Sequence, residues 1–295
     1  NHRLIYMSLV ILKKLNPLEP NNQQWKRDLY QRYYEMGLIE AYKNNFRRAR
    51  SYIQLSIENC KRLIKTYDDR ETILIDISNS YGMLARIDRW EKNIDRAIRY
   101  AYEAEKYLIK AINKYGDVFG IINQNLASIL EDLGEFQSFN SQFERAKKSY
   151  NKSLKIRLLL TEADESNSHW QIDLSNSYLH IADIEHKLKA PNRYHQEQNY
   201  YKCMNIRQTL YTESPSNIHI KHLYLDSLMA LGDFYLLSRN EIEKIKGRDL
   251  ECWNKNDYAI QYYSKALSIA EELFSSNKLD KELEKTLQFL RLHYG

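Results

Sequence analysis

Histidine and aspartate side chains recur at helical spacing in the second half of the sequence. His180, Asp183 and His186 follow one another at steps of three residues, and His219 and His222 are also three apart. Groups at this spacing lie on one face of a helix, where imidazole and carboxylate groups could share a proton or bind a metal ion. The second pair lacks a third ligand on its face, and the first three residues fit the polar lining of a groove. We therefore predict no metal site and no other cofactor.

The other residue patterns that support catalysis are missing from the sequence. It contains no glycine-rich loop of the kind that binds nucleotide phosphates. Cys60, Cys203 and Cys252 are far apart, form no Cys-x-x-Cys pair and have no neighbouring histidine that would activate a thiol. Cysteines that cannot all pair fit a reducing compartment, so we expect a cytoplasmic protein that is not an enzyme.

A low content of glycine and proline points to a helical protein. Among 295 residues there are 8 glycines and 4 prolines, while 43% of the residues are hydrophobic. Such a composition favours long helices joined by short turns. The net charge of +5 comes from interleaved acidic and basic residues, which argues against a dedicated nucleic-acid binder. The longest apolar run, residues 4–12, is about half of a membrane span, so no membrane partner is expected.

The sequence contains internal repeats. Residues 149–184 align with residues 199–234 without a gap, and residues 8–29 align with residues 153–174. Unrelated segments would share only one or two identical positions, so the alignment indicates a repeated structural unit. Identical pairs include Tyr150 and Tyr200, Arg157 and Arg207, Ser177 and Ser227, Asp183 and Asp233, and Trp25 and Trp170.

Each repeated unit is predicted to form two antiparallel helices. An apolar stripe at steps of four, four and three residues predicts a helix that Ser166 or Asn167 can cap. The segment 214–217, with its proline, ends the helix that follows and begins the next one. The stripe consists of Trp170, Leu174, Tyr178 and Ile181.

Small residues recur at one position of each first helix, where the two helices of a unit are expected to cross. Small–large pairs, such as Ser56-Ile57 and Ala266-Leu267, recur in the second helices. This pattern resembles the tetratricopeptide repeat family over essentially the whole chain. The units are longer than the family's repeat of about 34 residues, and they resemble bacterial tetratricopeptide arrays of signalling and defence proteins. The small residues at the crossing position are Gly37, Ala85, Ala127, Ala182 and Gly232.

The resemblance implies an all-α fold, a right-handed superhelical solenoid of antiparallel helix pairs with about five units plus partial end helices. Residues 238–256 stand out as an insertion, which we expect to form a loop or a short helix rather than a catalytic lid. Partial units at both ends predict that the sequence is a fragment of a larger protein. The predicted single domain, 1–295, consists of a partial unit 1–20, repeat units 21–69, 70–116, 117–165, 166–215 and 216–276, and a partial unit 277–295.

The family geometry points one face of each first helix into a concave groove, where a partner would bind. Arg86 and Arg89 lie three residues apart beside aromatic residues and could hold an acidic group of a ligand. The aspartates of later units would favour a basic portion of the ligand. The alternative is that these charges only solvate the inner face or pair with one another. The candidate partner-binding residues are Tyr34, Tyr42, Arg86, Arg89, Trp90, Asn125, His180, Asp183, Asp226 and Asp233.

Three classes of function follow from this pattern. We predict a non-enzymatic scaffold that binds a protein or peptide segment in the groove. The alternative is a sensor or regulatory region of a larger bacterial signalling or antiviral defence effector, with an NTPase or caspase-like protease domain in the same chain. The third class is an RNA-binding helical repeat, against which the acidic residues of the later units argue, because they repel a phosphate backbone.

Overall fold

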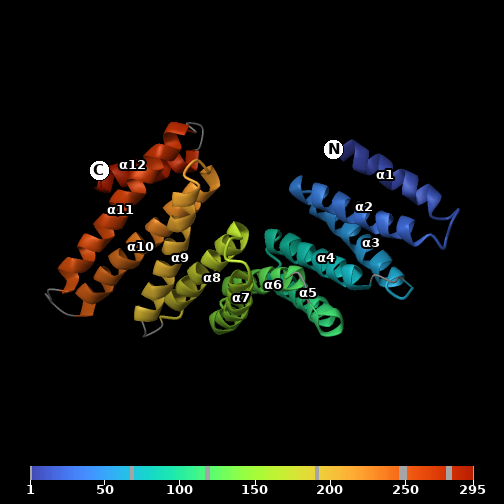
Figure 1. Ribbon diagram of the computed structural model, residues 1–295, viewed down its shortest axis with the longest axis horizontal. Coiled ribbons are helices and arrows are strands. Elements are labelled where there is room, and N and C mark those ends of the chain that lie inside the picture. Colours follow the sequence, from blue (N-terminus) through green and yellow to red (C-terminus); the bar gives the residue numbers. More distant parts are fainter. Residues whose placement is uncertain are drawn as a thin grey trace. The chain divides into compact units, whose positions relative to one another are not determined.

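The computed structural model describes residues 2–66, 70–116, 120–189, 193–245, 251–276 and 281–294, and all regular structure in these ranges is helical (Figure 1). The predicted all-α class of paired helices is confirmed. The chain divides into two compact units, Asn1–Leu160 (the N-terminal unit) and Thr161–Gly295 (the C-terminal unit), which are described separately. The helices are α1 (His2–Leu15), α2 (Gln23–Tyr42), α3 (Phe46–Leu63), α4 (Arg70–Trp90), α5 (Ile94–Tyr115), α6 (Ile121–Phe139), α7 (Phe143–Ala163), α8 (Ser168–Lys187), α9 (Arg193–Glu213), α10 (Ile218–Ile245), α11 (Glu251–Ser276) and α12 (Lys281–Tyr294).

Asparagine residues begin three of the first helices. The side chains of Asn22 and Asn167 accept hydrogen bonds from the backbone amides of Trp25 and Trp170, at 3.0 and 3.2 Å. Asn217 accepts in the same way from the amide of Ile220, at 3.3 Å. A side-chain oxygen at this position satisfies an amide that has no partner within the helix. The predicted cap at Asn167 is therefore confirmed.

The turns inside four helix pairs share one backbone conformation. A residue with positive φ follows α2, α4, α6 and α8, although none of the four is a glycine. In the first three turns the residue directly after the positive-φ residue donates its backbone amide to a carbonyl near the end of the preceding helix, for example Asn45 to Glu40 at 2.8 Å. These bonds hold a short, tight connection between antiparallel helices. The positive-φ residues are Asn44, Lys92, Ser141 and Lys189.

Glycine lets the two helices of a pair approach closely at the crossing position. A Cβ atom on Gly37 would lie 2.4 Å from the Cδ1 atom of Ile53 on α3. A Cβ atom on Gly134 would lie 2.6 Å from the ring of Tyr150 on α7. Real Cβ atoms do not come so close to a neighbouring atom, so the second helix fills the space that the missing side chain leaves.

The crossing residue of the third pair is Gly134, and the predicted crossing at Ala127 is wrong. Ala127 lies two turns earlier on α6, where its carbonyl accepts a hydrogen bond from the Ser153 hydroxyl at 2.8 Å. Both residues are small, buried and on one face of the helix, so spacing alone did not separate them. The corrected register also moves the groove position predicted for Asn125 to Asp132.

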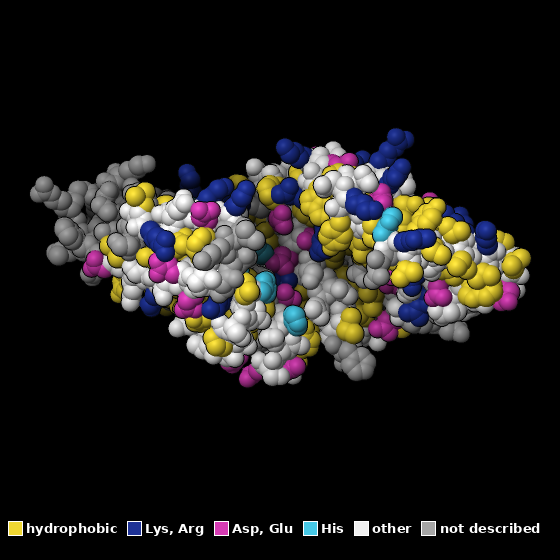
Figure 2. All heavy atoms as spheres, turned by 90° about the horizontal axis from the view of Figure 1, so that it is seen from above, with side chains coloured by type: hydrophobic (Ala, Val, Ile, Leu, Met, Phe, Trp, Pro, Cys, Tyr) yellow, Lys and Arg dark blue, Asp and Glu magenta, His cyan; other side chains and the backbone are white. Residues whose placement is uncertain are grey.

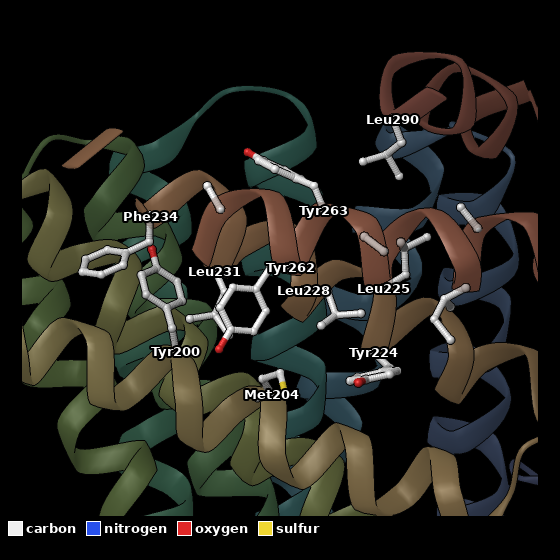
Figure 3. Packing of buried hydrophobic residues seen from close by; sticks show 14 of the residues in the cluster. Tyr200, Met204, Tyr224, Leu225, Leu228, Leu231, Phe234, Tyr262, Tyr263 and Leu290 are labelled. Atoms are coloured by element: carbon white, nitrogen blue, oxygen red, sulfur yellow. The ribbon is translucent and has the colours of Figure 1, made fainter. Parts of the chain in front are cut away.

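Aromatic and aliphatic side chains fill the core of the C-terminal unit, where α9, α10, α11 and α12 meet (Figure 3). Leu228, Leu231 and Tyr263 are fully buried there. Each fully buried side chain of this size contributes about 1.5–3 kcal/mol to folding. Leu283, Leu287 and Leu290 attach α12 to this core.

The segment 238–256, which was predicted as an insertion, is helical up to Ile245 and again from Glu251. Residues 246–250 lie outside the described residues. In the described part of the chain, no helix combines the length and the hydrophobicity needed to cross a bilayer.

Side chains of both charges mix on the face that Figure 2 shows, and hydrophobic side chains gather at its N-terminal end. This mixture agrees with the interleaved charges of the sequence. At the N-terminal end α1 exposes Leu4, Tyr6, Met7 and Ile11.

Candidate functional site

Acidic residues of α6 in the N-terminal unit are paired with arginines of α4. The Nε atom of Arg86 lies 2.9 Å from an Asp132 carboxylate oxygen, and the Nε atom of Arg89 lies 3.5 Å from a Glu135 carboxylate oxygen. The guanidinium carbon of Arg89 also lies 3.4 Å from the ring centre of Phe139. The arginines predicted to bind an acidic ligand thus pair with acids of the same unit, which was the stated alternative.

Burial raises the pKa of Asp132 to about 6, although the Arg86 guanidinium beside it acts in the opposite direction. Burial disfavours the charged form of a carboxyl group, and a nearby cation favours it. Here burial has the larger effect. Ionised Asp132 therefore depends on Arg86 at neutral pH.

The aromatic residues predicted beside the arginines differ in exposure. Tyr42 and Trp90 are the last residues of α2 and α4, and their exposed fractions are 81% and 47%. The ring centre of Trp90 lies 5.8 Å from that of Phe46. Tyr34 is half-buried and packs against the hydrophobic cluster between α2, α3 and α4.

A cavity of 390 Å³ lies between α8, α9 and α10 in the C-terminal unit. Three of the predicted partner-binding residues, Asp183, Asp226 and Asp233, line it together. Their side chains are accessible from the cavity, while apolar and aromatic side chains form the rest of its wall. The other lining residues are Leu179, His186, Gln196, Tyr200, Met229, Ala230 and Phe234.

Two tyrosines hold two of these carboxylates in place. The Tyr200 hydroxyl on α9 donates to Asp183 Oδ1 at 2.8 Å. The Tyr263 hydroxyl on α11 donates to Asp233 Oδ1 at 2.5 Å. Asp183 and Asp233 occupy the same position of successive first helices, one residue after the crossing residue, so this Tyr–Asp hydrogen bond is itself repeated. Each bond uses one carboxylate oxygen and leaves the other for a second contact.

The cavity is an acidic site with cationic side chains nearby. Burial raises the pKa of Asp183, against the effects of the Tyr200 hydrogen bond and of the nearby His180, Lys187 and His186. Burial likewise raises the pKa of Asp226, against the effects of Arg207 and His222. Burial thus outweighs the nearby cations for both carboxyl groups.

Other candidate groups do not join this site. His180 is half-buried on α8 and does not line the cavity. In the part of the chain that the structure describes, no three His, Cys, Asp or Glu side chains are close enough together to hold a metal ion. Cys203 is buried, and burial raises the pKa of its thiol to about 11, so the nucleophilic thiolate is disfavoured.

The sequence pattern missed several residues of the site. Tyr200 matches Tyr150 in the repeat alignment, but alignment alone did not indicate that its hydroxyl holds Asp183. Tyr263 lies beyond the aligned region, so its match to Asp233 had no signal in the gap-free repeats. His186, which was predicted to be part of the polar lining of a groove, borders the cavity beside Asp183.

Comparison with solved structures finds similar folds at low sequence identity. BtubC (BKLC) from P. vanneervenii matches with a TM-score of 0.65 and 13% identity, over 92% of this chain and 90% of that one. The apo form of RapI matches with a TM-score of 0.64 and 14% identity, over 97% of this chain, which spans only 64% of the RapI chain. The S. pombe nuclear import adaptor Nro1 matches with a TM-score of 0.59 and 12% identity, over 96% of this chain and 90% of that one. No protein-family model and no curated protein sequence matches the chain.

Proposed function

Because the chain has a tetratricopeptide-like fold of stacked helix pairs, we propose that it is a non-enzymatic scaffold that binds a segment of a partner protein. The cavity of the C-terminal unit receives a basic side chain of that segment. The observation that carries this proposal is the convergence of Asp183, Asp226 and Asp233 on one cavity. A basic side chain would be attracted to these carboxylates and place its apolar stem against Leu179 and Met229.

The similar structures support a binding role without naming a partner. Nro1 is described as a nuclear import adaptor, and an adaptor acts by binding other proteins. The likeness is one of fold, so the chemistry of the ligand is inferred from the cavity alone. Stacked helix pairs offer extended surfaces for protein segments, and a cytoplasmic location is part of the proposal.

The charge of the cavity favours a basic protein segment over a nucleic acid. Three carboxylates near one another repel phosphate groups and attract ammonium or guanidinium groups. Surface charges are screened over about 8 Å at physiological ionic strength. Asp183, Asp226 and Asp233 are exposed, so the attraction should weaken as the salt concentration rises.

A peptide selection tests the proposal. Random dodecapeptides displayed on phage are selected on the purified 295-residue chain, and we expect the bound sequences to be enriched in lysine and arginine. The double variant Asp226→Asn/Asp233→Asn should lose most of this binding, because it removes two of the three cavity charges. The control double variant Asp257→Asn/Glu213→Gln removes the same charge at exposed positions away from the cavity and should keep it.

Two results would contradict the proposal. Selected peptides without an excess of basic residues would show that the cavity does not determine the ligand. Equal binding of the basic peptides to both double variants would place their binding site elsewhere on the chain.

A further inference from the structure

The N-terminal unit contains an internal counterpart of the cavity. The crossing residues of this unit are Ala85 on α4 and Gly134 on α6. Arg86 lies one residue after Ala85, and Arg89 lies four residues after it. Asp132, the partner of Arg86, lies two residues before Gly134. Glu135, the partner of Arg89, lies one residue after it. Two guanidinium groups thus link two successive first helices.

The same four positions in the C-terminal unit surround the cavity. Counted from Ala182 and Gly232, Arg86 corresponds to Asp183 and Arg89 to His186. The two acids of α6 correspond to Ala230 and Asp233 of α10. All four residues of the C-terminal unit line the cavity. The cavity therefore lies where the N-terminal unit places two arginine side chains.

The replacement of the two arginines of the N-terminal unit by an aspartate and a histidine explains both the volume and the charge of the cavity. Aspartate and histidine side chains are shorter than arginine side chains, so the space between the helices stays open. The acid that pairs with Arg89 in the N-terminal unit, Glu135, has its counterpart in Asp233, which keeps its negative charge but loses the guanidinium. The exchange of Arg86 for Asp183 adds a further carboxylate.

We propose that the cavity binds the guanidinium group of an arginine side chain of the partner protein, in preference to the ammonium group of a lysine. This inference rests on the proposed function and specifies its ligand. A planar guanidinium can donate to two carboxylates at once and can stack on an aromatic ring, which an ammonium group does less well.

The described contacts support this preference. Asp183 and Asp233 are each fixed by a tyrosine hydroxyl and so present an oriented acceptor. The rings of Tyr200 and Phe234, which lie together in Figure 3 with their centres 5.6 Å apart, form an aromatic part of the wall. Arg193 of the chain itself lies 5.4 Å from the centre of the Phe234 ring, yet it does not line the cavity. In the N-terminal unit Arg89 combines an acid and an aromatic ring in the same way.

The test compares two small probes on the full chain at low salt. N-acetylarginine methylamide and N-acetyllysine methylamide are titrated separately, and binding is followed by NMR shifts of backbone amides in α8 and α10. We expect the arginine probe to bind with about a tenfold lower Kd, because only its guanidinium can make paired charge-assisted bonds. Equal Kd values, or a tighter lysine probe, would overturn the preference.

A substitution tests the internal counterpart directly. His186→Arg places an arginine at the position of Arg89, next to Asp233, and should abolish the shifts by occupying the cavity. Gln208→Arg adds the same charge on an exposed face of α9 and should leave them unchanged. Arginine-probe binding that survives His186→Arg would refute the proposed binding mode.

The outcomes separate the inference from the proposed function. If both probes bind equally and Asp226→Asn/Asp233→Asn removes both, the basic-segment function stands and the guanidinium preference is wrong. If neither probe nor any basic peptide binds, both proposals fail. A nine-residue Gly-Ser peptide with one central arginine distinguishes the source of the group. The peptide should bind at least as tightly as the amide probe. If the peptide does not bind while the amide probe does, the cavity binds a free small molecule and not a protein segment.

Discussion

The two units use the same positions of successive first helices in opposite ways. Between α4 and α6, arginine and acid side chains pair with each other. Between α8 and α10, acids line an open cavity. The repeat brings the same positions together in both units. Whether a pair of positions becomes a structural contact or a binding site thus depends on the length and charge of two side chains.

The N-terminal unit also contains a buried ion pair, and we expect the largest loss of stability when it is broken. Asp88 is fully buried and accepts hydrogen bonds from Arg50 at 2.5 Å and from Arg96 at 2.6 and 2.8 Å. Asp88→Asn removes the charge that both guanidinium groups share, although Glu91 also contacts both, and should cost about 1.5–3 kcal/mol, as for hydrogen bonds to a charged group. The loss is measured as faster hydrogen exchange of amides in α4 and α5 and as a lower melting temperature.

The matched comparison for that variant is Asp226→Asn in the C-terminal unit. It removes a carboxylate that has no ion pair in the described structure, so stability should change by no more than about 0.5 kcal/mol. A similar loss in both variants would contradict the contrast between the two units.

The correspondence between positions of the two units depends on the crossing glycines, and substitutions there test it. Gly134→Leu and Gly232→Leu each force a side chain against a tyrosine ring, at 2.6 Å from Tyr150 and 2.7 Å from Tyr263 for the Cβ atom alone. Each should cost about 1–3 kcal/mol of overpacking, measured by thermal or urea unfolding followed by circular dichroism. Gln208→Leu, at an exposed helical position, is the control. An unchanged melting curve for either glycine variant would invalidate the register.

The smallest effect concerns the protonation of Asp132. Its pKa should be about 6 by NMR titration, compared with an ordinary value of 3.8. Because the folded state binds this proton more tightly than the unfolded state, its contribution to stability should fall as pH rises from about 4 to about 6. Arg86→Gln should raise the pKa further, since the guanidinium lowers it. A pKa near 3.8 in the parent protein would show that burial is not the dominant effect.

The sequence predicted the helix pairs well because their signals are local. Apolar residues at helical steps, asparagine caps and small residues at the crossings all act within one helix or one pair. The register of the third pair failed because Ala127 and Gly134 are both small and lie seven residues apart on α6. Only the approach of Tyr150 from α7 distinguishes them.

The candidate site was predictable only in part. The three aspartates were chosen from their helix positions, and the structure brings them to one cavity. The pairing of Arg86 with Asp132 was not predictable, because 46 residues separate the two in sequence and no local spacing indicates that they meet. Binding roles for Tyr42, Trp90 and the arginines stay predictions, and so does a defence effector in the same chain.

The turns between paired helices suggest why the fold is recognisable while the sequence is not. Asn44, Lys92, Ser141 and Lys189 have the same left-handed conformation with three different side chains. Backbone amide–carbonyl bonds, which any residue except proline can make, hold the first three of these turns. Substitutions can therefore accumulate at the turns while the angle between the helices is kept. This chain already forms the same turn with different residues. Its sequence can therefore differ greatly from others of this fold while the helices keep their orientation.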